Sequence, residues 1–281
     1  MLYVTFPEWI SPTILPGLPI RWYGVLYLVG FAITYGLLAH EVRRRQLAIE
    51  REDLTNLFFW GIVGLLVGAR LLFVLVCDST GELIRKPWLI VWPFRDGLFT
   101  GIQGMSYHGG LIGAVVAVII YARRRGLDLL EWGDMLAASA PLGYALGRLG
   151  NFINGELYGR VTTLPWGIIY PTARRSPAQE EWVRNVAAEV GLPLSDPNQM
   201  VNLPRHPSQL YEAALEGLLV WLLLWFVFRK RSPYHGFLLS AYLVSYGIIR
   251  FFAEYFRQPD AGLGFTVTPA AEQVSQLLTD P

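Results

Sequence analysis

The sequence predicts an all-α fold, a polytopic membrane helix bundle with six clear spans and an external arm or head insertion. Of its 281 residues, 53% are hydrophobic and only 16% are charged, which is too apolar for an ordinary soluble domain. Six apolar segments are long enough, or nearly long enough, to cross a membrane. The net charge of +1 gives no basic footprint for nucleic acid, and the single cysteine, Cys77, excludes an internal disulfide.

The six expected spans are residues 22–40, 54–76, 106–121, 132–152, 209–228 and 236–256. The second carries a stripe of glycines, Gly61, Gly64 and Gly68, against which another helix can pack closely. The first twenty residues have no basic start and four prolines, so we expect the first span to stay as an anchor instead of being cleaved as a signal peptide.

Basic clusters predict the orientation of these spans. They lie at residues 43–45 with Arg51, at 123–125 and at 229–231, each between two consecutive spans. The positive-inside rule assigns all three connections to the cytoplasm, so the N-terminus is expected outside. The chain is then expected to divide into an external N-terminal segment (1–21), spans 1–4 (22–153), a periplasmic-side arm (154–208), spans 5–6 (209–257) and a C-terminal tail (258–281).

Unusual polar residues collect near the outer ends of the spans in this topology. They are Tyr23, Arg70, His108, Arg148, Asn151, Tyr211, Glu212, Arg250 and Glu254. Ionisable residues within spans are rare and usually face the interior of the bundle, which makes them candidates for a functional site.

Spacing places several of these residues on shared helix faces. Tyr246, Arg250 and Glu254 follow at i, i+4 and i+8, so Arg250 and Glu254 can pair. Arg148 and Asn151 are three residues apart and also share a face. Glycines near these residues leave backbone N–H groups accessible to a ligand. Together with two arginines and an asparagine, they predict a phosphate-binding site within the membrane, where the dielectric constant is low.

His108 is the candidate proton acceptor, because an unperturbed histidine titrates near neutral pH. The four histidines are scattered and none has the HExxH spacing, so we expect neither a metal site nor a cofactor. Structural alternatives stand beside these interpretations. Arg148 could be a structural arginine that extends to the membrane–water interface, and His108 could be an interfacial histidine that hydrogen-bonds to a carbonyl. Arg250 and Glu254 could form a structural ion pair.

Five motifs then resemble one family, the bacterial prolipoprotein diacylglyceryl transferases. They are GRLGNFINGELYGR at 147–160, SYHGGLIG at 106–113, RHPSQLYEA at 205–213, YGIIRFFAEYFRQPD at 246–260 and RWYGVLYLVGF at 21–31. The resemblance covers residues 6–260 in order, and the first motif alone is a specific fourteen-residue polar match.

The resemblance implies a transferase that moves the diacylglyceryl group of phosphatidylglycerol onto the lipobox cysteine of a preprolipoprotein signal peptide. A thioether forms and glycerol phosphate leaves, as the first step of bacterial lipoprotein maturation. The expected location is the cytoplasmic (inner) membrane, with the active site toward the outer leaflet. The expected partners are these two substrates and membrane lipid.

The resemblance also implies roles for individual residues. Arg148 is expected to bind the lipid head group, and Tyr23 and His108 are expected to be required. The residues expected to bind phosphatidylglycerol are Arg148, Asn151, Gly159, Tyr246 and Arg250, those expected to catalyse are His108, Arg148, Arg250, Tyr23 and Glu254, and those expected in support are Asn154, Glu156 and Glu212.

One departure and two rival functions stay open at this point. The family usually has a seventh span, and the sequence after Asp260 supplies none, so either that span is missing or the sequence is truncated. A transporter for an anionic solute would also bring arginines into the membrane, but near its midplane and usually with inverted repeats. A non-catalytic binder of anionic lipid or signal peptides would need the arginines but not His108.

Overall fold

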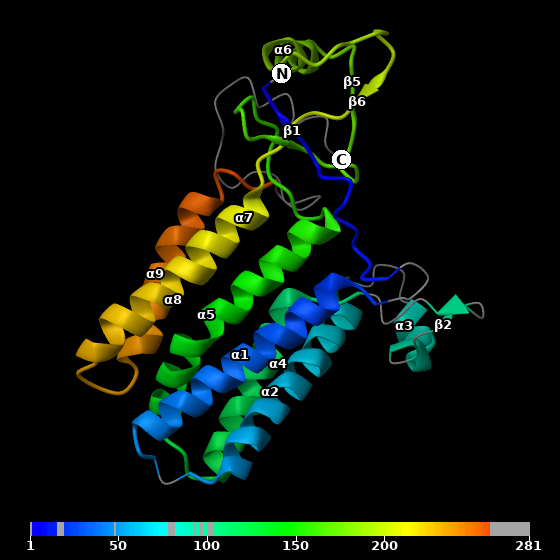
Figure 1. The fold of residues 1–281 in the computed structure, drawn as a ribbon. Helices are drawn as coiled ribbons and strands as arrows, with labels where there is room; N and C mark the ends of the chain where they lie inside the picture. The colour runs from blue at the N-terminus through cyan, green and yellow to red at the C-terminus, as the bar shows by residue number, and fades with distance from the viewer. Residues whose placement is uncertain are drawn as a thin grey trace. The chain divides into compact units, whose positions relative to one another are not determined.

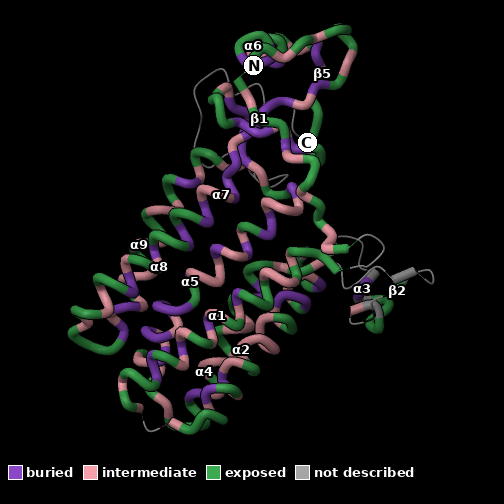
Figure 2. The backbone as a smooth tube through the Cα atoms, viewed as in Figure 1, coloured by how far each residue is buried: buried purple, intermediate pink, exposed green. Residues whose placement is uncertain are grey.

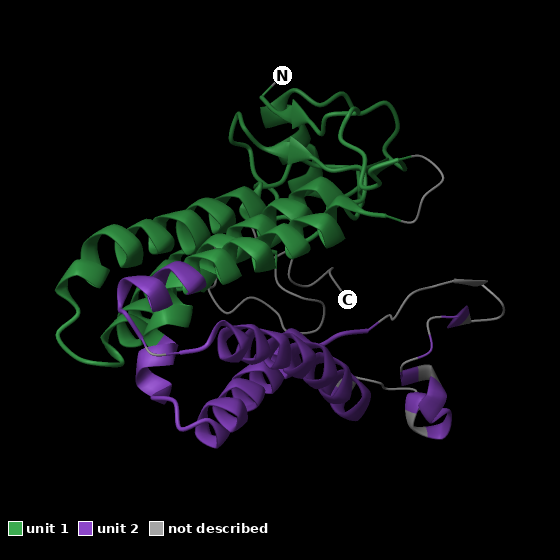
Figure 3. Cartoon of the chain, turned by 60° about the horizontal axis from the view of Figure 1, so that its bottom comes forward, with its two compact units in different colours: residues 1–38, 134–281 green, residues 39–133 purple. Residues whose placement is uncertain are grey.

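The computed structural model of the protein describes residues 2–15, 20–47, 49–77, 82–90, 92, 94–95, 98–99 and 104–258. The chain forms two compact units, coloured separately in Figure 3. One contains residues 1–38 and 134–281, and the other contains residues 39–133. Helix α1 (Trp22–Arg44) begins in the first unit and ends in the second.

The unit of residues 39–133 is built on two helices that pack through glycines. They are α2 (Arg51–Leu72), continued by the π-helical segment η1 (Phe73–Cys77), and α4 (Tyr107–Arg124). Gly64 and Gly68 of α2 face Gly109 and Gly113 of α4 so closely that a Cβ on any of them would collide with a backbone carbonyl of the other helix. Such seams are typical of membrane helices, where close backbone approach contributes much of the packing.

Short elements lie between α2 and α4 in the sequence. They are α3 (Glu82–Arg85), the 3₁₀ segment η2 (Pro87–Ile90) and the antiparallel pair β2 (Phe94–Arg95) and β3 (Leu98–Phe99). Arg70 donates from Nε to the Ile90 carbonyl at 2.7 Å and from Nη1 to the Gly104 carbonyl at 2.8 Å. Arg70 therefore ties this connection to α2.

The unit of residues 1–38 and 134–281 contains most of the long helix α5 (Leu129–Asn154), whose first turn belongs to the unit of residues 39–133. It also contains two further helical stretches. The first runs from α7 (Ser208–Glu212) through η3 (Ala213–Leu219), α8 (Val220–Leu222) and η4 (Leu223–Phe228) to η5 (Arg229–Arg231), and the second is α9 (Phe237–Ala253). Two of these segments, η3 and η4, are π-helical. α1 meets α5 where Gly30 approaches Gly143, and η3 meets α5 where Gly217 approaches Ala145.

A buried carboxylate fixes the start of α9. Asp134, near the beginning of α5, accepts the backbone N–H groups of Gly236 and Leu239, each at 2.9 Å. These N–H groups lie in the first turn of α9, where no partner within the helix is available. One helix therefore caps another at the end of the bundle that lies away from the arm in Figure 1.

The arm folds together with the N-terminal segment at the opposite end of these helices (Figure 1). Strand β1 (Val4–Thr5) pairs in parallel with β4 (Ile168–Ile169), and β5 (Ser176–Pro177) pairs antiparallel with β6 (Met200–Val201). Helix α6 (Glu181–Val190) buries Val183, Ala187 and Val190. A second small core forms around Phe6 and Tyr170. The structure thus gives the arm elements of its own and joins residues 2–15 to it.

All six segments expected to span are helical. α1, residues Arg51–Val76 and residues Ser208–Arg231 are each long and apolar enough to cross a membrane, whereas α9 is apolar but shorter. Much of the surface of α2 and α4 is exposed in Figure 2, and it carries large apolar side chains such as Leu66, Leu71 and Leu111. Such a surface suits lipid as a solvent. The expected tail lies almost wholly outside the described residues, and the division into spans and arm stays a prediction.

Candidate active site

Arg148 lies near the end of α5 that leads into the arm, one turn after Tyr144. Its Nε donates to the Tyr144 hydroxyl at 2.8 Å, and its guanidinium carbon lies 5.0 Å from the centre of the Tyr144 ring. The same Nε is 3.0 Å from Glu212 Oε2. The Arg148 side chain is only 16% exposed. It therefore points into the bundle, as expected for a charged residue in a membrane helix, and does not extend along the surface.

Two buried carboxylates face Arg148 from the neighbouring helical stretch. Glu212 ends α7 and Glu216 follows in η3, so the two lie about one turn apart, and each residue is 1% exposed. The Tyr144 hydroxyl donates to Glu216 and lies 3.5 Å from Glu212 Oε2. One phenol thereby connects α5 to both carboxylates.

The third side of this group comes from α9 and the turn after it. Arg250 Nη2 donates to Glu254 Oε2 at 2.7 Å, which confirms the ion pair expected from their spacing. Arg250 Nη1 is 3.5 Å from Glu216 Oε1, and Arg257 Nε is 3.6 Å from Glu212 Oε1. The Tyr246 ring meets the Tyr144 ring edge to face, with centres 6.3 Å apart.

We call this group the arginine–glutamate cluster; it comprises Tyr144, Arg148, Glu212, Glu216, Arg250, Glu254 and Arg257. It gathers three guanidinium groups within one set of apolar helices. A guanidinium presents several N–H donors in a fixed plane and stays charged in proteins, so such a cluster suits a phosphate or a carboxylate. Among the described residues, no group of three histidine, cysteine or carboxylate side chains is placed to hold a metal ion.

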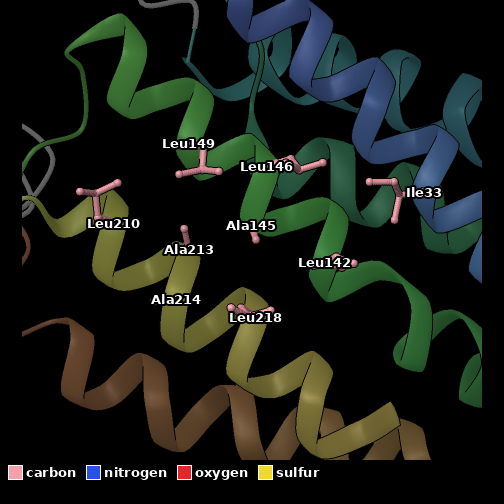
Figure 4. A pocket seen from close by; sticks show the side chains of 9 residues that line it. All are labelled: Ile33, Leu142, Ala145, Leu146, Leu149, Leu210, Ala213, Ala214 and Leu218. Carbon is pink, nitrogen blue, oxygen red and sulfur yellow. The ribbon is translucent and has the colours of Figure 1, made fainter. Parts of the chain in front are cut away.

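Two of the helical segments that carry the cluster also line an aliphatic groove (Figure 4). It has a volume of about 350 Å³. Its walls come from α1, α5 and the α7–η3 stretch, and consist of Ile33, Leu142, Ala145, Leu146, Leu149, Leu210, Ala213, Ala214 and Leu218. Leu149 directly follows Arg148, and Ala213 directly follows Glu212. A charged cluster and an apolar groove therefore lie on neighbouring positions of the same two helical segments.

The end of α5 is closed by a second polar group. The side-chain amides of Asn151 and Asn154 donate to the same oxygen of Glu156, at 2.9 Å and 3.2 Å. Gln209 in turn donates to the Glu156 backbone carbonyl at 2.7 Å. Glu156 thus holds the turn after α5 in position, eight residues beyond Arg148.

The comparisons with known proteins identify the family of this site. The sequence matches the family described as prolipoprotein diacylglyceryl transferase over residues 11–280. The chain belongs to this family. Its relatives include bacterial proteins named phosphatidylglycerol–prolipoprotein diacylglyceryl transferase. The one from Treponema pallidum is 47% identical over 279 residues, which cover 94% of this chain and 84% of that protein. The one from Borreliella burgdorferi (strain ZS7) is 39% identical over 276 residues, which cover 95% and 83%.

The structure brings together the expected residues Arg148, Glu212, Arg250 and Glu254 of this diacylglyceryl transferase, with Tyr246 beside them. Tyr23 lies in the first turn of α1, where its hydroxyl donates to Tyr27 at 3.0 Å. Its ring packs against α5, since a Cβ on Gly150 would lie 3.0 Å from Tyr23 Cδ2. The roles of Tyr23 and of these cluster residues in the reaction stay predictions.

Gly159 has a packing reason to be glycine. Its N–H donates to the His206 carbonyl at 2.9 Å, and a Cβ would collide with the Phe256 carbonyl. The neighbouring Arg160 donates to the Arg257 carbonyl at 2.8 Å and to the Glu254 carbonyl at 3.0 Å. The motif thus joins the arm to the end of α9 directly behind the cluster.

His108 lies in the first turn of α4, in the unit of residues 39–133. The residue is exposed, and its ring meets that of Tyr107 edge to face, with centres 5.7 Å apart. The Ser106 side chain caps the helix by accepting from the Gly109 N–H at 3.3 Å. The role of His108 as a proton acceptor stays a prediction.

Sequence reasoning missed Tyr144, Glu216 and Arg257. Tyr144 precedes Arg148 by four residues, and Glu216 follows Glu212 by four, so the same helix-face rule that paired Arg250 with Glu254 would have found both. Glu216 was also a rare carboxylate inside an apolar span. Arg257 follows Glu254 by three residues and lies just past the end of α9.

Proposed function

We propose that this protein transfers the diacylglyceryl group of phosphatidylglycerol to prolipoproteins, and that the arginine–glutamate cluster binds the phosphate of the lipid. The observation that carries the assignment of the site is the convergence of Arg148, Arg250 and Arg257 on two buried glutamates at the arm end of apolar helices, two of which also line an aliphatic groove. Charged donors supply what a lipid phosphate needs, and the groove supplies what an acyl chain needs.

The bond changes would take place at the glyceryl carbon. The sulfur of the lipobox cysteine attacks this carbon, a C–S bond forms, and the C–O bond to the phosphate breaks with its electron pair on oxygen. Arg148 and Arg250 hold the phosphodiester and stabilise the charge on the leaving glycerol phosphate. Asn151 orients the head group, Glu254 holds Arg250, and Tyr23 and Tyr246 donate hydrogen bonds.

The attacking thiol must lose its proton. A free thiol titrates at roughly pH 8.5, so it is mostly protonated near neutral pH and needs a base. His108 takes this proton, directly or through water, in our mechanism. Its replacement by asparagine is expected to lower the rate and to change its pH profile.

The lipid would enter sideways from the bilayer, with one acyl chain in the groove and its phosphate at the cluster. Support comes from the groove's aliphatic lining and from its place next to Arg148 and Glu212 in the sequence. The prolipoprotein signal peptide would also enter between helices. The protein would span the bacterial inner membrane several times, with its N-terminus outside and this site toward the outer leaflet.

Purified protein, phosphatidylglycerol and a lipobox peptide test this proposal. Mass spectrometry should show the peptide gaining the mass of one diacylglyceryl group. Arg148→Ala should lower turnover by roughly 100-fold or more, the loss typical of removing a donor that stabilises developing charge. Arg124→Ala, which removes an exposed arginine at the end of α4, is the matched control and should leave turnover unchanged. Turnover at the wild-type rate in Arg148→Ala would remove the cluster from the reaction.

A further inference from the structure

Glu212 occupies the position in the arginine–glutamate cluster that an added anion would need. Its Oε2 lies 3.0 Å from Arg148 Nε and 3.9 Å from Arg250 Nη1, and its Oε1 lies 3.6 Å from Arg257 Nε. One buried carboxylate therefore faces all three guanidinium groups of the cluster. Glu254 differs, since it accepts a hydrogen bond from Arg250 and its side chain is 20% exposed.

The cluster is already neutral without a ligand. Arg148, Arg250 and Arg257 carry three positive charges, and Glu212, Glu216 and Glu254 carry three negative charges when ionised. A phosphodiester added to this arrangement would leave one uncompensated negative charge among buried groups, which is costly. Binding of an anionic lipid therefore requires one of the carboxylates to give way.

Glu212 is the carboxylate held least firmly by hydrogen bonds. Arg148 Nε directs its hydrogen bond to Tyr144, and the Tyr144 hydroxyl donates its own to Glu216. Among the described residues, the buried atoms without a hydrogen-bond partner include one oxygen of each of the two glutamates, Glu212 Oε1 and Glu216 Oε1, and Arg250 Nη1. Glu212 accepts only a long hydrogen bond of 3.5 Å from the Tyr144 hydroxyl and otherwise faces the arginines by charge at 3.0–3.9 Å, whereas Glu216 accepts a shorter bond from Tyr144 and Glu254 accepts one of 2.7 Å from Arg250.

We propose that Glu212 is a built-in counter-anion that holds the three arginines in position and competes with the lipid phosphate for them. The proposal rests on the proposed function, because it takes the phosphate of phosphatidylglycerol as the competing anion. Glu212 is then a positioning residue that sets the affinity for anionic lipid and the rate at which the anionic product leaves.

Four proteins test the competition: wild type, Glu212→Gln, Arg257→Gln and the double variant. The measurement is the dissociation constant of phosphatidylglycerol without any peptide acceptor, so that no transfer occurs. Glu212→Gln leaves one excess positive charge and should bind about tenfold tighter, in the range expected for one partly buried charge pair. Arg257→Gln should bind about tenfold weaker for the opposite reason. The double variant, whose charges balance again, should return to the wild-type value.

Diacylglycerol, which lacks the phosphate, is the uncharged probe, and its affinity should be the same in all four proteins. Glu131→Gln removes a carboxylate from the Arg45–Glu131 pair in the other unit and should leave phosphatidylglycerol affinity unchanged. In turnover, Glu212→Gln should lower both KM and kcat, because the phosphate product leaves more slowly. A merely structural role for Glu212 would instead weaken binding of both lipids.

Equal or weaker binding of phosphatidylglycerol by a folded Glu212→Gln would overturn the proposal. If Glu212→Gln does not fold, the affinities of Arg257→Gln and of the double variant for phosphatidylglycerol are compared instead. A double variant that does not regain the wild-type affinity also overturns the proposal. The proposed function fails by a different observation, namely the absence of diacylglyceryl transfer to the peptide by the wild-type protein. Wild-type transfer with unchanged affinity in the variants would reject the counter-anion alone.

Discussion

His206 is a partly buried histidine at the joint between the arm and the helices. Its Nδ1 lies 3.4 Å from the Tyr211 hydroxyl, and its ring meets those of Tyr211 and Phe256 edge to face. Burial and, to a smaller extent, the positive charge of Arg160 together lower the pKa of His206 to about 4. The folded protein therefore keeps this ring neutral at pH values where an unfolded chain protonates it.

This difference predicts a loss of stability in acid. The unfolded ring titrates near 6.5, so between about pH 6.5 and 4 the unfolded state binds a proton that the folded state does not. Stability should fall as the pH falls through this window, by roughly 1–2 kcal/mol once solvent screening of the partly exposed ring is allowed for.

The thermal unfolding midpoint in detergent at pH 7 and pH 5 measures the effect. His206→Gln should lose less stability than wild type over the same interval, since only the titration of this ring has been removed. Equal losses in the two proteins would contradict the assignment and transfer the acid sensitivity to the carboxylates.

Individual site residues could be predicted where spacing on one helix was enough. The pairing of Arg250 with Glu254 followed from their i, i+4 positions, and the structure confirms it. The contacts of Glu212 with Arg148 and Arg257 could not be derived in this way, because they join different helices. Sequence alone gives the depth of a residue in a span but not the rotation of that span about its axis.

At the scale of elements, the glycine seam explains why α2 and α4 approach so closely. Gly68 and Gly109 face each other, and a Cβ on either would collide with the carbonyl oxygen of the other. Gly61, on the same helix as Gly68, differs because a Cβ there would make only an ordinary 3.4 Å contact with Val118 Cγ2. The glycine stripe expected from the sequence therefore contains positions of unequal importance.

Gly68→Ala should destabilise the protein by roughly 1–3 kcal/mol, because the two helices must move apart to admit the methyl group. Activity should fall as well, since Gly109 directly follows His108. Gly61→Ala is the matched control, and it should be neutral or slightly stabilising because alanine favours the helix. Thermal unfolding in detergent compares them, and equal midpoints for the two variants would refute the role of the seam.

The helices could be predicted far better than the arm. A membrane span can be recognised in a sequence by a run of some twenty apolar residues, and each of the six expected segments contains a helix. The arm's strands have only two residues each, and β1 pairs with β4 from a distant part of the sequence. No periodicity marks such short strands. The π-helical turns of η3 and η4 were likewise hidden, because they change the hydrogen bonding of an apolar helix without changing its composition.

At the scale of the whole molecule, the positions of charge relative to the helices predict an orientation. The arm adjoins one end of α7 and α9, and the basic segment η5 lies at the other end of the α7–η4 stretch. This stretch covers residues 208–228, and a helix of that length rises roughly 30 Å, about the thickness of the apolar part of a bilayer. The arm and η5 should therefore lie on opposite sides of the membrane.

Cysteine labelling can measure this orientation, because Cys77 is the only native cysteine. In a Cys77→Ala background, Ser195→Cys places a thiol on the exposed surface of the arm, and Ser232→Cys places one just after η5. A membrane-impermeant maleimide added to spheroplasts should label Ser195→Cys nearly completely. It should reach Ser232→Cys only after the membrane has been opened, since the basic clusters favour the cytoplasmic side. The reverse pattern would invert the topology and turn the arginine–glutamate cluster toward the cytoplasm, where the arm would face prolipoproteins before their export.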